Sequence, residues 1–228
     1  MHLEKHFKQS DLIKDIVIGM ADGLTVPFAL AAGLSGVVAQ NSIILTAGTA
    51  EICAGSIAMG LGGYLAGRTE IEHYDSELKR EYQEIIDHYE TERSEVKEIF
   101  ATYGLSPASQ ELIINELSKD EDKWVDFMMR FELGLDKPSP QRARKSALNI
   151  GFAYVAGGII PLLGYVFTSV PYEGLIVSSV ITVICLFIFG YFKSELTGQN
   201  PLSGALKTTA IGVVAAAAAF LIAGLISH

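Results

Sequence analysis

The chain has 228 residues, half of them hydrophobic, and its formal net charge at pH 7 is −9. This apolar content is high for a soluble domain, and the charge is unevenly placed, because residues 70–137 alone carry a net charge of −11. An acidic segment of this kind repels nucleic acid and attracts cations, so nucleic acid is excluded as an expected partner.

Five apolar runs are long enough to cross a bilayer, which takes about 20 mostly apolar residues. They cover residues 16–40, 43–67, 147–167, 174–192 and 205–226. The first two are joined by a short turn, and linkers with Pro171 and Pro201 separate the last three. We therefore expect an all-α integral membrane protein with five transmembrane helices.

The acidic segment lies between the second and third runs and divides the chain into three parts. Residues 1–67 hold the N-terminal segment and the first two spans, residues 68–145 an acidic helical insert, and residues 146–228 the last three spans. Two apolar stripes at helical spacing predict that the insert packs on itself as a small helical domain. The first stripe includes Ile85, Ile86 and Val96, and the second includes Leu112 and Trp124. No helix breaker separates the second span from the insert, so one long helix is expected to join them.

Lysine and arginine gather on one side of the predicted membrane. They occur in the N-terminal segment, at both flanks of the insert and at Lys193, whereas the loops assigned to the other side have none. Since basic loops face the cytosol, we expect the N-terminus and the insert there and the C-terminus in the opposite compartment.

Two acidic residues interrupt the first two spans, Asp22 and Glu51. A carboxylate in mid-membrane is costly unless it is neutral, paired or hydrated, so such residues favour a path for cations or protons. Met59 lies two turns after Glu51 on nearly the same helix face and offers a soft ligand suited to transition metals. The alternatives are protonated acids bonded within the bundle and a methionine that only packs.

Small residues are dense in the spans, with Gly19 and Gly23 as one GxxxG pair. They let helix backbones approach closely in lipid. Packing within one bundle and a seam between two copies are both compatible with this pattern.

A row of acidic residues in the insert predicts one continuous acidic helix face. Its members are spaced by three or four residues: Glu77, Glu81, Glu84, His88, Glu92 and Glu95. Like charges at this spacing destabilise a helix, and a bound divalent cation would offset them. Met128 and Glu132 form a further pair, one soft and one hard ligand, that could face the row. The alternative is a solvated acidic face.

Other chemistries have little support. A di-iron carboxylate enzyme would use Glu-x-x-His from two helices, and only residues 70–73 fit. Neither a phosphate-binding loop nor a zinc motif occurs. We expect no enzyme activity and no prosthetic group.

Two stretches closely resemble the vacuolar iron transporter family in its plant form. They are DIVIGMADGLTVPFALAAGL at residues 15–34 and GTAEICAGSIAMGLGGYLAGRTEIEHY at residues 48–74. The likeness covers essentially the whole chain. It implies a five-span homodimer in the vacuolar membrane that exchanges cytosolic Fe²⁺ for protons, with a path at the dimer interface and the C-terminus in the lumen.

The resemblance also assigns site residues. The family's membrane acids and methionine match Asp22, Glu51 and Met59. Its cytosolic metal-binding ligands match Glu81, Glu84, Glu92, Glu95, Met128 and Glu132. His88 has no assigned counterpart. The insert is expected to accept Mn²⁺, Zn²⁺ or Co²⁺ besides Fe²⁺, and a transporter chiefly for Mn²⁺ or a membrane-anchored metal buffer remain the alternative functions.

Overall fold

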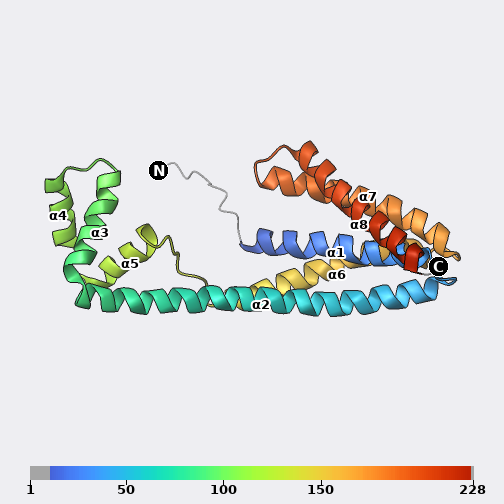
Figure 1. The fold of residues 1–228 in the computed structure, drawn as a ribbon, viewed down its shortest axis with the longest axis horizontal. Coiled ribbons are helices and arrows are strands. Elements are labelled where there is room, and N and C mark those ends of the chain that lie inside the picture. The colour runs from blue at the N-terminus through green and yellow to red at the C-terminus, as the bar shows by residue number, and fades with distance from the viewer. Residues whose placement is uncertain (1–10, 227–228) are drawn as a thin grey trace. The chain divides into compact units, whose positions relative to one another are not determined.

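The structure is a computed structural model, and it describes residues 11–226. Within this range the chain forms eight α-helices and no strand (Figure 1). They are α1 (Asp11–Ser35), α2 (Asn41–Asp87), α3 (Tyr89–Thr102), α4 (Pro107–Leu117), α5 (Glu121–Phe131), α6 (Arg142–Val166), α7 (Pro171–Leu196) and α8 (Pro201–Ile226). The expectation that Lys5 and Lys8 face the cytosol and His228 the opposite compartment concerns residues outside the described range.

Five of these helices are long and apolar enough to cross a membrane: α1, α2, α6, α7 and α8. The all-α fold with five spans is therefore confirmed. In α2 the apolar part is residues 43–67, and the helix then continues without a break into the acidic sequence (Figure 1). The expectation of one long helix at this point is also confirmed.

The first span is shifted relative to the predicted range, because α1 begins at Asp11 and ends at Ser35. After Ser35 the chain turns, and the backbone N–H groups of Val37 and Val38 both donate to the carbonyl of Leu34. Hydropathy alone does not show this end, since the turn residues 36–39 are themselves small or apolar.

The chain divides into two compact units. The first consists of residues 1–65 and 143–228, and the second of residues 66–142. Each is described by itself below, and α2 contributes to both.

In the first unit, glycines of α1 allow close contact with other helices of the same chain. A Cβ at Gly19 would run into the backbone of Ile150 on α6, and one at Gly23 into the backbone of Tyr154. Further along α1, a Cβ at Gly33 would lie 3.2 Å from the carbonyl oxygen of Ala219 on α8. These glycines thus serve packing within one bundle, and their presence needs no second copy.

The second unit has its own hydrophobic core, in which the two predicted stripes meet. The stripe residues Ile85 and Val96 are buried there with Trp124. Both stripes are narrower than the pattern predicts, because Ile86 and Leu112 are exposed.

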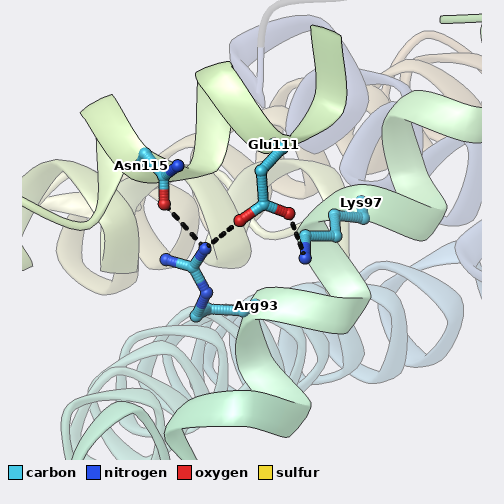
Figure 2. Close-up of polar contacts among 4 residues, drawn as sticks. All are labelled: Arg93, Lys97, Glu111 and Asn115. Atoms are coloured by element: carbon cyan, nitrogen blue, oxygen red, sulfur yellow. Dashed lines mark hydrogen bonds and ion pairs between the residues drawn. The ribbon is translucent and has the colours of Figure 1, made fainter. Parts of the chain in front are cut away.

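A polar cluster joins α3 to α4 in this unit (Figure 2). The guanidinium of Arg93 donates to the Glu111 carboxylate and to the Asn115 side-chain oxygen, both at 2.7 Å, and Lys97 pairs with Glu111 at 2.6 Å. Arg93 is buried, so these bonds are partly shielded from water. Arg93 and Lys97 are therefore engaged by α4, whereas Arg80 pairs with Glu77 and Glu84 of the acidic row.

Candidate functional site

The acidic row does not form one continuous helix face. α2 ends at Asp87, α3 begins at Tyr89, and His88 between them has the non-helical angles φ −125° and ψ 30°. The chain changes direction at this point (Figure 1). The predicted continuous face is therefore wrong, because the helix that should carry it is broken within the row.

The break brings acidic residues together that a straight helix would hold apart. In one helix, Glu81 and Glu92 would be about 16 Å apart along the axis. In the structure, one carboxylate oxygen each of Glu81, Glu92 and Glu132 lie within 4.8 Å of one another. Three carboxylates at this separation form a set of hard oxygen ligands that suits a divalent cation.

Burial makes this cluster unusual among acidic surfaces. Glu81 and Glu92 are only 1% and 4% exposed, while Glu132, the residue that caps α5, is exposed. One oxygen of Glu81 and one of Glu92 are buried without a hydrogen-bond partner among the described residues. Buried charges are normally paired or bind metal, so these two atoms leave room for a cation.

The proton affinity of the cluster reflects the same environment. Burial, and then repulsion from Glu132 and Glu84, raises the pKa of Glu81 to about 7. Burial, followed by the charges of Glu95 and Glu81, raises the pKa of Glu92 to about 7 as well. Although Glu132 is exposed as a residue, its carboxyl is partly desolvated beside the cluster, and this, followed by the charge of Glu95, raises its pKa. A cation that entered would displace protons near neutral pH.

Glu84 and Glu95 lie beside this cluster rather than in it. Their charges act on the three clustered carboxyls, so they are near neighbours. Glu84 pairs with Arg80 at 3.4 Å, and the same Arg80 pairs with Glu77 at 2.7 Å. Their predicted role as ligands stays a prediction.

Met128 is fully buried in the hydrophobic core of the second unit, together with Val96, Ile114 and Trp124. It lies on α5, one turn before Glu132, whose backbone N–H donates to the Met128 carbonyl. The structure thus gives its side chain a packing role, and its role as a soft ligand stays a prediction.

The first unit contains the membrane acids. The hydroxyl of Tyr154 on α6 donates to Oε1 of Glu51 on α2. The other oxygen, Oε2, is buried and has no hydrogen-bond partner among the described residues. Glu51 is thus held through one oxygen and offers the second to another group.

Asp22 is half-buried on α1 and directly precedes Gly23, which packs against the backbone of Tyr154, the residue whose hydroxyl contacts Glu51. The third span thereby connects the two membrane acids, which the sequence pattern alone does not show. Met59 is half-buried on α2. Its predicted part in a metal path stays a prediction.

Asp15 is a further acidic residue of this unit that the sequence analysis did not single out. It is 2% exposed and accepts hydrogen bonds from Ser146 at 3.0 Å and Asn149 at 3.3 Å, both on α6. Its position seven residues before Asp22, two turns away on the same helix face, is the pattern that indicates it. Hydropathy does not single it out, because it directly precedes the predicted span of residues 16–40.

The sequence profile of the VIT family matches residues 13–224, which include every site residue described above. The chain belongs to the VIT family. The family match spans all five apolar helices and the acidic insert together, so the two units are parts of one family architecture.

Relatives cover nearly the full chain. "Vacuolar iron transporter 1" of Arabidopsis thaliana is 54% identical over 227 residues, covering 100% of this chain and 91% of the relative. "Vacuolar iron transporter 1" of Tulipa gesneriana is 51% identical over 222 residues, covering 97% and 90%. "Protein CCC1" of Saccharomyces cerevisiae is 38% identical over 217 residues, covering 92% and 67%.

Proposed function

We propose that this VIT family chain is a proton-coupled antiporter that moves cytosolic Fe²⁺ across the vacuolar membrane into the vacuole. Membership in the family and the names of its plant relatives support iron as the cargo and the vacuole as the place. A transporter of this kind carries out no bond chemistry, in agreement with the expected lack of enzyme activity.

One observation carries the transport function more than any other. Glu51 lies within an apolar span, and its Oε2 is buried without a partner among the described residues. A merely structural acid in a membrane would have both oxygens satisfied, since an unpaired one is costly there. An exchangeable proton or metal ion at Oε2 accounts for the arrangement, and it disfavours a membrane-anchored buffer whose spans have no ion to pass.

The deciding experiment is metal flux into proteoliposomes with an imposed pH gradient. Fe²⁺ should enter when the lumen is acidic, and the lumen should become more alkaline as it does so. Mn²⁺ is measured in parallel, and faster Mn²⁺ than Fe²⁺ uptake would favour the alternative cargo. Uptake that ignores the pH gradient would contradict proton coupling.

We further propose that the insert collects divalent ions through the cluster of Glu81, Glu92 and Glu132. The two buried unpartnered oxygens of this cluster support the proposal. The surplus negative charge of residues 70–137 attracts cations from the cytosol. Fe²⁺, Mn²⁺, Zn²⁺ and Co²⁺ all meet the ligand chemistry.

The proposed assembly is a homodimer, on the strength of the family resemblance. The glycines of α1 no longer support it, because they contact α6 and α8 of the same chain. Light scattering on protein in detergent and in nanodiscs measures the mass directly. A monomer in both that still transports metal would refute the dimer.

A further inference from the structure

A buried tyrosine, Tyr154, contacts only one of the two carboxylate oxygens of Glu51 among the described residues. Its ring is 2% exposed on α6, and its hydroxyl donates to Oε1 of Glu51. A tyrosine hydroxyl has one proton to donate, so it holds one carboxylate oxygen and leaves the other. Because Oε2 has no partner among the described residues, one oxygen of Glu51 remains for a cation.

Two glycines create the space in which Tyr154 lies. On α2, a Cβ at Gly55 would lie 2.5 Å from the Tyr154 hydroxyl oxygen, so only glycine leaves room for the phenol. On α1, a Cβ at Gly23 would run into the Tyr154 backbone. Gly55 is one turn after Glu51, and Gly23 directly follows Asp22. Residues of α1, α2 and α6 together therefore determine the position of the phenol.

We propose that Tyr154 is a specificity-determining residue of the Glu51 site, because its hydrogen bond to Oε1 disfavours binding of a cation through both Glu51 oxygens and so disfavours large, oxygen-rich cations such as Ca²⁺. The inference rests on the proposed function, since it assumes that a metal ion passes Glu51.

The chemistry of the competing ions supports this role. Ca²⁺ takes six to eight oxygen ligands and often binds a carboxylate through both oxygens. Transition-metal ions are smaller, accept fewer ligands and tolerate a thioether such as Met59. When Oε1 of Glu51 is engaged by Tyr154, the affinity of the site falls more for Ca²⁺ than for Fe²⁺. The hydrogen bond from Tyr154 therefore favours Fe²⁺ over Ca²⁺.

The test measures Fe²⁺ uptake by the full chain in liposomes with an acidic lumen, under reducing conditions, against a series of external Ca²⁺ concentrations. The readout is the Ca²⁺ inhibition constant divided by the KM for Fe²⁺. Tyr154→Phe removes the hydroxyl and frees Oε1, and this ratio should fall about tenfold.

Gly55→Ala is an independent second variant. It keeps the tyrosine but pushes the phenol away from Glu51, and it should lower the ratio in the same direction. The matched control is Tyr165→Phe, a buried tyrosine on the same helix whose hydroxyl bonds Ser35 at 2.8 Å. This control should leave the ratio unchanged. Because the insert is the same in all variants, any Ca²⁺ that it binds affects each of them equally and cancels in the comparison.

Each outcome decides the matter. A ratio that is unchanged in both variants overturns the inference while the proposed function stands, provided that wild-type protein transports Fe²⁺. Wild-type protein without Fe²⁺ uptake overturns the proposed function itself. Folded variants without any uptake, or failure of both variants to fold, would show that the phenol serves transport or the fold and does not select ions.

Discussion

Asp22 is half-buried on α1, and asparagine has nearly the same shape and volume as aspartate. Asp22→Asn keeps the volume but removes the titrating group, so it should abolish gradient-driven Fe²⁺ uptake while the protein still folds and inserts. Uptake into proteoliposomes with an acidic lumen measures this, and elution by size exclusion checks the fold. Uptake at the wild-type rate would rule out Asp22 as an obligatory carrier.

The raised pKa values of Glu81 and Glu92 make the stability of the insert depend on pH. Between the ordinary value near 4.5 and the folded value of about 7, the folded state binds more protons than the unfolded state. The free energy of unfolding therefore falls as pH rises through this window. In chelator-containing buffer, the insert should melt at lower temperature at pH 7.5 than at pH 5.

Trp124 provides the measurement, because it is the chain's only tryptophan and is buried in the core of the insert. Its fluorescence follows unfolding of the insert within the full chain. Replacing both Glu81 and Glu92 with Gln should flatten the pH dependence, and added Mn²⁺ should raise the melting temperature most at high pH. A melting temperature that rises with pH in the absence of metal would contradict this account.

Among the helices, α3 and α4 are joined by a polar cluster whose strength can be tested. Arg93→Met keeps most of the side-chain volume but removes two hydrogen bonds, to Glu111 and Asn115. The free energy of unfolding of the insert should fall by about 2 kcal/mol, since hydrogen bonds from a buried charged group contribute more than exposed ones. Chemical unfolding followed by Trp124 fluorescence measures the loss.

The control for this variant is Lys119→Met, which removes an exposed pair with Glu116 at 2.6 Å. Exposed ion pairs contribute little to stability, so this substitution should change the free energy of unfolding by no more than about 0.5 kcal/mol. Equal losses in the two variants would show that the Arg93 cluster has no special stabilising role.

The helices also show what sequence patterns predict and where they fail. Length and hydropathy predicted five spans and the continuous α2, because both depend on local composition. The break at His88 was not predictable in this way, since neither glycine nor proline marks it. Core packing on either side of the break, with Ile85 and Val96 both buried, is a tertiary effect that a helical spacing rule does not contain.

The candidate site shows the same division. Glu81, Glu92 and Glu132 were all predicted, but their meeting point depends on the break and on α5, both of which are tertiary features. Tyr154 was missed because a tyrosine in an apolar span has no pattern of its own. Its role became visible only through the hydrogen bond to Glu51.

At the scale of the whole molecule, the insert and the membrane acids should contribute to different kinetic constants. Replacing Glu81, Glu84, Glu92 and Glu95 with Ala removes collected metal but leaves Asp22 and Glu51. The KM for Fe²⁺ should rise by about tenfold, because the local concentration of cations falls, while the maximal rate stays near the wild-type value. Uptake across a concentration series in proteoliposomes measures both constants.

High salt should weaken the advantage of the wild-type insert, since it screens attraction between exposed charges. The difference in KM between the wild-type and alanine proteins should therefore shrink in 0.5 M salt, a concentration with a Debye length of about 4 Å. A lowered maximal rate with an unchanged KM would contradict the collecting role and place the four residues in the transport step itself.

The break at His88 also divides the carboxylate cluster into a local pair and one residue that is distant in sequence. Glu81 and Glu92 are close in sequence, so the corner between α2 and α3 brings them together through local contacts, which form fast. Glu132 lies at the C-terminal end of α5, which packs on the core of the insert, so its contact with the other two is long-range in sequence. A metal ion held by all three carboxylates would therefore link the end of α5 to the corner between α2 and α3, as a disulfide links distant parts of a small domain.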